Sequence, residues 1–225
     1  MPDFKKITHV IYDLDGLLLD TEPIYDRVYQ AIARPYGKIL SESVKSQISG
    51  RNALDSARTI IEMLDLPLTP ESFLREREPL LRDLLPDAKP LPGAVRLTQH
   101  LHQHRIRQAV ATSSAGLSFE LKTSNHTEWL ALFDCIVKGN DPAIALGKPA
   151  PDIFLITAQR LDADPAECLV FEDTLAGLKA AIGAGMSVVA VPDSSMDKQL
   201  YHNAHQVLNS LREFQPQLWQ LPAFD

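Results

Sequence analysis

Five short apolar runs recur along the chain, and within them polar side chains do not alternate with apolar ones. The runs cover residues 7–12, 108–111, 135–137, 168–171 and 187–191. Short runs rich in valine and isoleucine are typical of strands that are buried on both faces. Helical segments lie between several of them, as at residues 153–161 and 175–184, so the connections indicate parallel crossover units. The pattern predicts an α/β fold with a doubly wound parallel sheet.

The first two runs are separated by a long segment that carries no strand signal. Its residues indicate several helices instead: Thr21 starts one, Asn52 caps another, and Thr69 starts a third, in which Pro79 is expected to produce a kink or a break. About 70 residues of helix exceed an ordinary crossover, so we expect a separate domain. The expected division is an α/β core over residues 1–18 and 91–225, and an inserted helical cap over residues 19–90, with a return linker over residues 85–93.

The charge balance limits the partners that the chain can have. Its 225 residues include 22 Lys and Arg against 29 Asp and Glu, a formal net charge of −7. An acidic chain without a basic run binds nucleic acid and anionic membranes poorly, and we expect neither partner. No apolar stretch reaches the ~20 residues that cross a bilayer, and no signal-peptide pattern begins the sequence. Cys135 and Cys168 begin apolar runs, as buried reduced thiols do, so we expect a cytoplasmic protein.

Pairs of acidic residues follow two of the predicted strands. Asp13 and Asp15 come directly after the first strand, and Glu172 and Asp173 come directly after the fourth. Ligands of parallel sheets bind at the carboxyl edge, where these side chains are expected to meet. Taken singly, an Asp-x-Asp-Gly segment is also compatible with an ordinary turn, and paired acids with the capping of a helix.

Two further segments place side chains that suit phosphate near the same edge. The second strand ends in Thr112-Ser113, whose hydroxyls and main-chain N–H groups can form an anion cradle, although helix capping explains most such segments. Lys148 lies between a glycine and a proline just before a helix, a rigid frame that gives a lysine a fixed direction. A surface lysine is the alternative interpretation of this position.

The four segments together indicate more than any one of them does. Their four acidic residues bring a formal charge of −4 into one cleft. Two like charges ~4 Å apart repel by ~4 kcal/mol at an effective dielectric of about 20, so the cluster requires a cation. Oxygen ligands favour Mg²⁺, which commonly binds through one or two carboxylates and a substrate phosphate. The sequence therefore predicts a magnesium site beside a phosphate site, with Lys148 and Thr112 at the phosphate oxygens.

This ordered set of residues resembles the haloacid dehalogenase superfamily of phosphohydrolases. The set consists of Asp13-x-Asp15-Gly, Thr112, Lys148-Pro149 and Glu172-Asp173. The helical insert resembles the type-1 cap of the β-phosphoglucomutase-like branch. Segments over residues 122–126, 205–211 and 214–222 resemble the pseudouridine-5′-phosphatase group, whose neighbours act on glycerol phosphates, sugar phosphates or FMN.

The resemblance implies a role for each acidic residue. Asp13 would attack phosphorus and form an aspartyl-phosphate, and Asp15 would protonate the leaving alkoxide and then activate water. Asp13, the main-chain carbonyl of Asp15, and Asp173 would bind Mg²⁺. Glu172 would be a further metal ligand or a hydrogen-bond acceptor close by.

The resemblance also implies which residues bind the substrate. Thr112 and Lys148 would neutralise the transferring oxygens, with Ser113 beside them. Arg51, at a turn between two predicted cap helices, is a candidate for contact with a substrate hydroxyl or phosphate, or else a solvated loop residue. Because the true dehalogenases of the superfamily lack the second aspartate of the first motif, the presence of Asp15 argues against dehalogenation.

Three functions stay open at this point. The first is a Mg²⁺-dependent phosphatase that acts as a monomer on a small phosphorylated metabolite, such as pseudouridine 5′-phosphate or a sugar phosphate. The second is a phosphomutase of the β-phosphoglucomutase type, which differs in how its cap excludes water. The third is an inactive protein that binds a phosphate ligand, against which the complete set of acids and lysine argues.

Overall fold

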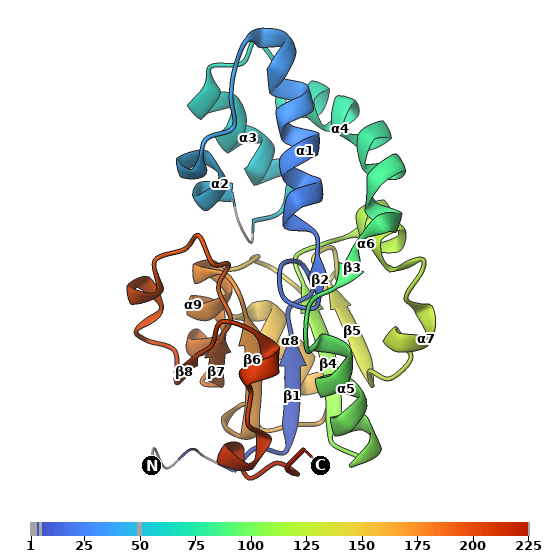
Figure 1. Ribbon diagram of the computed structural model, residues 1–225, viewed down its shortest axis with the longest axis vertical. Helices are drawn as coiled ribbons and strands as arrows, with labels where there is room; N and C mark the ends of the chain where they lie inside the picture. The colour runs from blue at the N-terminus through green and yellow to red at the C-terminus, as the bar shows by residue number, and fades with distance from the viewer. Residues whose placement is uncertain (1–3, 5, 49–50, 225) are drawn as a thin grey trace.

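The centre of the protein is a six-stranded parallel sheet (Figure 1). In this computed structural model, which describes residues 4, 6–48 and 51–224, the strand order is β5-β4-β1-β6-β7-β8. The strands are β1 (His9–Tyr12), β4 (Arg107–Thr112), β5 (Cys135–Lys138), β6 (Cys168–Glu172), β7 (Ser187–Ala190) and β8 (Gln206–Val207). Neighbouring strands pair in parallel, and the order reverses at β1. The predicted doubly wound α/β fold is confirmed.

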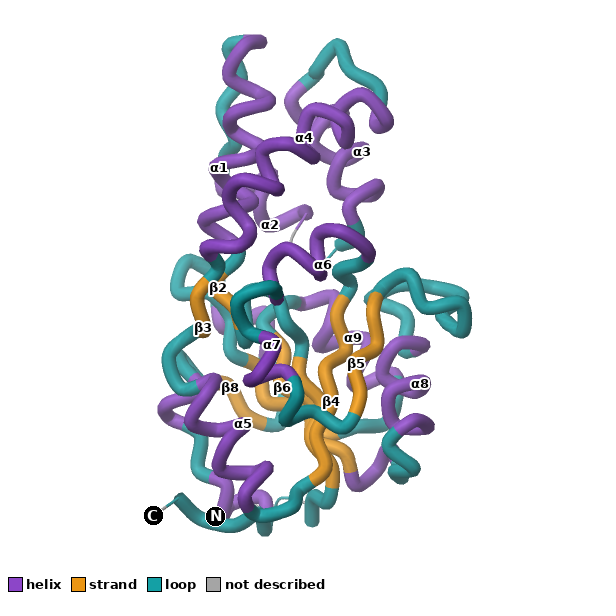
Figure 2. Tube along the Cα trace, turned by 90° about the vertical axis from the view of Figure 1, so that its right-hand side faces the viewer, coloured by secondary structure: helices purple, strands orange, loops and turns teal. Residues whose placement is uncertain are grey.

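The predicted apolar runs lie in strands because the sheet is buried on both faces. Val10 and Ile11 are adjacent in β1 and fully buried, yet they belong to different hydrophobic clusters. Helices cover the two faces (Figure 2): α5 (Ala94–Gln103), α6 (Gly116–Thr123) and α7 (Thr127–Leu130) contribute to one cluster, and α8 (Asp152–Arg160) and α9 (Leu175–Gly183) to the other. The strand β8 is not among the predicted ones, because its two half-buried residues form no apolar run.

A second body of helices lies above the carboxyl edge of the sheet (Figure 1). Its helices are α1 (Glu22–Ala33), α2 (Glu42–Ile48), α3 (Ala53–Leu64) and α4 (Pro70–Leu84), and they share a hydrophobic cluster of their own. Asn52 and Thr69 each accept a main-chain hydrogen bond in the first turn of the helix that they cap. Of the kink or break expected at Pro79, the break is wrong, since α4 continues as one helix with Phe73 and Leu81 buried on either side of the proline.

A short antiparallel pair of strands joins the two bodies. β2 (Leu19–Asp20) pairs with β3 (Lys89–Pro90), so the segments that leave and re-enter the core lie side by side (Figure 1). The expectation that residues 19–90 contain no strand is therefore wrong at both ends of that segment. A strand of two residues has no periodicity for a sequence to display, so the pairing alone reveals it.

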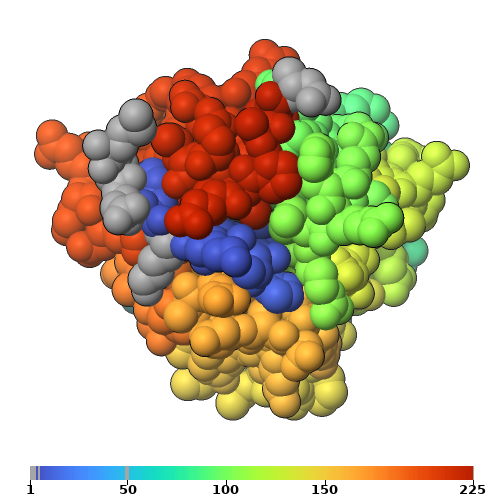
Figure 3. Space-filling view, turned by 90° about the horizontal axis from the view of Figure 1, so that it is seen from below, coloured from blue at the N-terminus to red at the C-terminus, as the bar shows by residue number. Residues whose placement is uncertain are grey.

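The amino ends of the strands lie at the end of the molecule opposite the cap helices. Figure 3, seen from below, shows the C-terminal segment beside the N-terminal region and α5. Trp219 is fully buried and stacks on Phe4, with ring centroids 4.0 Å apart. Side chains thus fill this end of the sheet, whereas the carboxyl edge faces the cap helices. None of the helices described here has both the length and the apolar character needed to cross a membrane.

The helix α9 approaches the end of β6 closely at Gly177. A Cβ atom on Gly177 would lie 1.7 Å from Oε1 of Glu172, the last residue of β6. Only a residue without a side chain permits this approach. Gly183, near the other end of α9, has more room, because its Cβ would lie 3.6 Å from the nearest neighbour, Pro151.

Replacing Gly177 by alanine should lower the free energy of unfolding by about 1–3 kcal/mol, because the buried carboxylate of Glu172 must move. Gly183→Ala is the matched control in the same helix. It adds the same methyl group at an ordinary contact distance and should be neutral or stabilise by up to about 1 kcal/mol. Urea unfolding followed by circular dichroism measures both variants, and equal stabilities would contradict the close approach.

Candidate active site

One lysine joins the acids that follow neighbouring strands at the carboxyl edge. The ammonium of Lys148 donates hydrogen bonds to Asp13 Oδ1 (2.5 Å), to Glu172 Oε1 (2.6 Å) and to the carbonyl of Ala111 (3.1 Å). The lysine side chain is only 1% exposed. β1 and β6 are adjacent in the sheet, so their ends bring Asp13 and Glu172 within reach of the same cation.

Glu172 links Lys148 to the start of α9. Its second oxygen, Oε2, accepts hydrogen bonds from the main-chain N–H groups of Asp173 and Thr174 and from the Thr174 hydroxyl, each at 3.0 Å. Thr174 in turn caps α9, because its hydroxyl accepts a bond from the N–H of Gly177 at 3.0 Å. The carboxylate of Glu172 is therefore oriented from both sides, by a lysine and by a helix terminus.

Asp173 carries a buried carboxylate with an unpartnered oxygen. Among the described residues no hydrogen-bond donor reaches its Oδ1. Burial, with Glu172 and Asp13 nearby, raises the pKa of Asp173 well above its usual value. Its Oδ2 faces the turn after β1, where a Cβ atom on Gly16 (φ 77°) would lie 2.4 Å away. A buried carboxylate oxygen without a donor suits a divalent cation that takes oxygen ligands.

Asp13 is the second buried acid of the site. Burial raises its pKa to about 7, although the charge of Lys148 acts in the opposite direction. In the part of the chain that the structure describes, no group of three acidic, histidine or cysteine side chains forms a ready-made metal cluster. The residues nevertheless fit Mg²⁺, which commonly uses only one or two protein carboxylates and completes its shell with water and substrate phosphate. Asp13 and Asp173 can supply these two.

Asp15 accepts side-chain hydrogen bonds at both of its oxygens. Lys122 and Thr21 (3.0 Å) donate to Oδ1, while Ser114 (2.8 Å) and Thr112 (3.3 Å) donate to Oδ2. Burial raises the pKa of Asp15, but the charge of Lys122 and these bonds outweigh burial, so the pKa lies below its usual value. Thr112, which the sequence analysis places at the phosphate, thus faces Asp15 in this arrangement.

Sequence reasoning assigns no role to Lys122, which the structure places in the site. Its side chain is fully buried and forms an ion pair with Asp15 and a hydrogen bond with the hydroxyl of Tyr25 in the cap. Lys122 lies on the buried face of α6, between Phe119 and Thr123. A lysine at an apolar position of a helical pattern is the signal that could have revealed it.

A cavity of about 310 Å³ lies between the sheet edge and the cap helices. Asp13, Asp15 and Ser113 line it from the core, and Arg51 lines it from the cap, so two expected substrate-binding residues face the same space as the two aspartates. Further cap residues that line it, none of which the sequence indicated, are Glu22, Tyr25, Tyr29, Lys45 and Arg77.

Both signs of charge are present in the cap side of this cavity. Burial and the nearby Asp15 raise the pKa of Glu22 to about 7. Arg77 is buried, and its guanidinium lies 5.5 Å and 5.8 Å from the ring centroids of Tyr25 and Tyr29. Its Nε has no hydrogen-bond partner in the described part of the chain. A ligand with several polar groups beyond its phosphate would find donors and acceptors here.

The arrangement suits the transfer of a phosphoryl group. Such transfer depends on an oxygen nucleophile in line with the bond that breaks and on positive charge beside the transferring oxygens. Asp13 provides a carboxylate at the floor of the cavity, and Lys148 provides a positive charge in contact with it. Asp15 provides a second carboxylate two residues away, with its orientation determined by four neighbouring donors.

Comparison with known proteins agrees with this geometry. The chain is 44% identical over 224 residues to (DL)-glycerol-3-phosphatase 1, mitochondrial, of Arabidopsis thaliana. This alignment covers 97% of this chain and 75% of that protein. It is also 42% identical over 223 residues to a Drosophila melanogaster protein named probable pseudouridine-5′-phosphatase, and this alignment covers 98% of this chain and 96% of that protein. The crystal structure of β-phosphoglucomutase from Clostridium difficile matches with a TM-score of 0.80 at 23% identity, over 95% of this chain and 96% of that one, a likeness of fold alone.

A family profile gives the assignment. The profile of haloacid dehalogenase-like hydrolases matches residues 7–185, which include β1, β4, β5 and β6, the cap helices and every acid and lysine of the site. The two relatives extend the match over nearly the whole chain. The chain therefore belongs to the haloacid dehalogenase-like hydrolases.

Proposed function

We propose that this protein is a phosphatase that hydrolyses small phosphorylated metabolites. Relatives that cover nearly all of the chain are named as phosphatases of glycerol phosphate and of pseudouridine 5′-phosphate. The observation that carries the proposal is the contact of Lys148 with both Asp13 and Glu172 at the sheet edge, next to a cavity that the cap helices cover. This contact places positive charge next to the proposed nucleophile, where the charge of the transferring oxygens must be offset.

In the proposed reaction, a carboxylate oxygen of Asp13 attacks phosphorus while the bond to the leaving oxygen breaks. Asp15 supplies the proton that the leaving alkoxide takes up. Water then attacks the aspartyl-phosphate and gives its proton to Asp15, which releases Asp13 as a carboxylate together with inorganic phosphate. Lys148 offsets the charge of the transferring oxygens, and Thr112 and Ser113 bind these oxygens once the phosphate is present.

We assign the metal site to Asp13, Asp173 and the main-chain carbonyl of Asp15. Bound Mg²⁺ supplies positive charge that offsets the acids and the phosphate. The buried Oδ1 of Asp173, which lacks a donor among the described residues, supports this assignment. Glu172 is proposed as the acceptor that orients Lys148 rather than as a ligand, because its oxygens already accept bonds from Lys148 and from the start of α9.

The wider setting of the enzyme is proposed from its sequence and its chain path. We propose a core over residues 1–18 and 91–225 and a cap over residues 19–90, since the β2–β3 pair brings the two crossing segments together. We also propose a cytoplasmic monomer without nucleic-acid or membrane partners, in line with a net charge of −7.

Asp13→Asn should lower turnover by at least about 1,000-fold, because the amide keeps the shape of the side chain but cannot attack phosphorus. Asp15→Asn should also lower turnover, yet it should accumulate a phosphoenzyme that decays slowly, since attack precedes the water step. Rapid quenching after incubation with ³²P-labelled substrate measures both. Asp20→Asn, an exposed acid in β2, is the control and should behave as the wild type. Wild-type turnover in Asp13→Asn would refute the mechanism.

Chelation should abolish turnover, and added Mg²⁺ should restore it, because buried acids beside a phosphate need a divalent cation. Asp173→Ala should raise the Mg²⁺ concentration for half-maximal turnover at least about tenfold, or remove activity altogether. Asp87→Ala, an exposed acid of the linker, serves as the control. Ca²⁺ should inhibit, since its larger shell orients nucleophile and phosphate less strictly. Full activity in excess EDTA would exclude the proposed metal site.

The substrate is expected to be a phosphomonoester whose leaving group carries several hydroxyls, with pseudouridine 5′-phosphate, glycerol 3-phosphate and sugar phosphates as the panel to test. A cavity between core and cap favours such small ligands over phosphoproteins. Arg51→Ala should raise KM for the best substrate about tenfold and leave hydrolysis of a small aryl phosphate nearly unchanged, because Arg51 lines the cap side of the cavity.

Arg58→Ala, an exposed arginine of α3, is the control for that variant and should leave both KM values unchanged. Turnover without an added bisphosphate activator separates hydrolysis from a phosphomutase reaction. If phosphopeptides are hydrolysed faster than every metabolite in the panel, the proposed substrate class is wrong.

A further inference from the structure

Lys122 uses all of its hydrogen-bonding capacity within the protein. Its ammonium, in a side chain that is fully buried, donates to Asp15 Oδ1, to the hydroxyl of Tyr25 (2.7 Å) and to the hydroxyl of Ser114 (2.8 Å). An ammonium has three N–H donors, so these contacts leave none for a substrate oxygen. Lys122 therefore differs from a lysine that binds phosphate directly.

The contact with Lys122 dominates the surroundings of Asp15. The two residues are 107 positions apart in the chain and form an ion pair from α6 to the turn after β1. Ser114 donates to the other oxygen of Asp15 and also accepts from Lys122, so the carboxylate and the ammonium share a hydroxyl between them. A carboxylate with one oxygen in an ion pair and both oxygens in further hydrogen bonds has little freedom to rotate.

The same lysine reaches into the cap. Tyr25 belongs to α1, and its ring lies against Tyr29 of the same helix and beneath the guanidinium of Arg77 from α4. The ammonium of Lys122 lies 5.0 Å from the centroid of the Tyr25 ring and also binds its hydroxyl. Lys122 thus contacts the acid of the core and an aromatic residue that is fixed within the cap.

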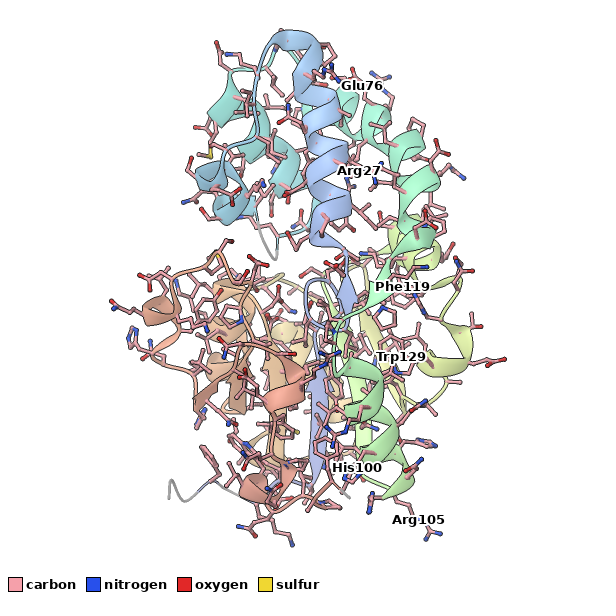
Figure 4. The ribbon with its side chains drawn as sticks, viewed as in Figure 1. Arg27, Glu76, His100, Arg105, Phe119 and Trp129 are labelled. Carbon is pink, nitrogen blue, oxygen red and sulfur yellow. The ribbon has the colours of Figure 1, made fainter. Side chains whose placement is uncertain are left out.

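The helix that carries Lys122 is itself placed at the junction of core and cap. α6 contacts α4 and the turn Leu85–Asp87, and Asn125 and His126 just beyond it bind the carbonyls of Pro86 and Ala88 in the returning linker. Figure 4 labels Phe119, one turn before Lys122, at the level where the cap meets the core. A displacement of the cap relative to the core would act on the Lys122–Tyr25 contact directly.

We propose that Lys122 is a positioning residue for Asp15. It orients the carboxylate that exchanges protons with the leaving group and with water, and through Tyr25 it makes that orientation depend on the position of cap helix α1. The proposal rests on the proposed function, in which Asp15 is the acid and the base. It assigns Lys122 no contact with the substrate.

Lys122→Met keeps an unbranched side chain of nearly the same length and removes the charge and the donors. We expect kcat for the best substrate to fall about 100-fold, because a misplaced acid–base group loses much of the 10²–10⁴-fold that such groups contribute, while KM changes less than about threefold. With 4-nitrophenyl phosphate, the first turnover should persist as a burst and the later turnovers should slow, since Asp15 acts on the water step. A merely structural role would lower the burst and the steady state together.

Lys138→Met is the matched control for that variant. The ammonium of Lys138 lies 4.5 Å from the ring of Phe119 on α6, but it is not among the described residues that donate to the Asp15 carboxylate. This variant should retain wild-type kcat and KM. Thermal unfolding of both variants shows whether they are folded.

A double-mutant cycle identifies the residue through which Lys122 acts. In the Asp15→Asn background, adding Lys122→Met should change the decay rate of the phosphoenzyme less than about twofold, because the group that the lysine positions is already absent. If the two effects multiply instead, Lys122 acts independently of Asp15 and the proposal fails. Wild-type kcat in Lys122→Met would also overturn it. In both cases an inactive Asp13→Asn variant would leave the proposed function standing.

Tyr25→Phe tests the link to the cap without removing the charge, and it decides the matter if Lys122→Met does not fold. The variant keeps the ring and leaves the buried ammonium one acceptor short, so kcat should fall about three- to tenfold. Tyr36→Phe, which removes a hydroxyl from the partly exposed ring in the turn after α1, should have no effect. Equal kcat values for Tyr25→Phe and the wild type would show that the cap does not influence Asp15 through Lys122.

Discussion

The contact of Lys148 with Asp13 and Glu172 is the interaction on which the rest of the site depends. Three acids with low exposure lie together at the end of β1 and β6, and their mutual repulsion would disfavour the folded state without a cation in contact with them. Lys148 supplies that cation to Asp13 and Glu172 from the loop between β5 and α8. Glu172 also accepts hydrogen bonds from the residues at the start of α9. This helix approaches Glu172 so closely that only glycine fits at position 177. The packing of α9 against β6 and the position of Asp13 are therefore linked through Glu172 and Lys148.

The structure divides the acids between two lysines. Lys148 pairs with Asp13 and Glu172, whereas Lys122 pairs with Asp15. The proposed nucleophile and the proposed acid–base group are only two residues apart, yet their environments shift their pKa values in opposite directions, upward for Asp13 and downward for Asp15. The two carboxylates of one turn therefore lie in different electrostatic surroundings. Asp173 is left with an oxygen that lacks a donor among the described residues, and this oxygen suits a metal ion.

We propose that the cap, rather than these acids, selects the substrate. Relatives that align over nearly the whole chain are named for substrates as different as glycerol phosphate and pseudouridine 5′-phosphate. The residues that line the cap side of the cavity come from α1, α2, α3 and α4 and from the turn between α2 and α3, and they include two carboxyls, two guanidinium groups, an ammonium and two phenols. The β2–β3 pair attaches this surface to the core at the point where the chain passes from core to cap and back.

The fold and most of the proposed site could be predicted from the sequence because they depend on local patterns. Strands that are buried on both faces appear in the sequence as short apolar runs, and parallel strands end at one edge of the sheet. Beside these strand ends lie Asp13, Thr112, Lys148 and Glu172. The side chains of Asn52 and Thr69 likewise mark the starts of helices. Lys122, Glu22 and the β2–β3 pair could not be predicted in this way. The apolar position of Lys122 in its helix can indicate that the lysine is buried, but not that it pairs with an acid 107 residues away, and strands of two residues have no period. Only the folded chain brings α6, α1 and the turn after β1 together, because their meeting is a property of packing across the cleft and not of any single segment.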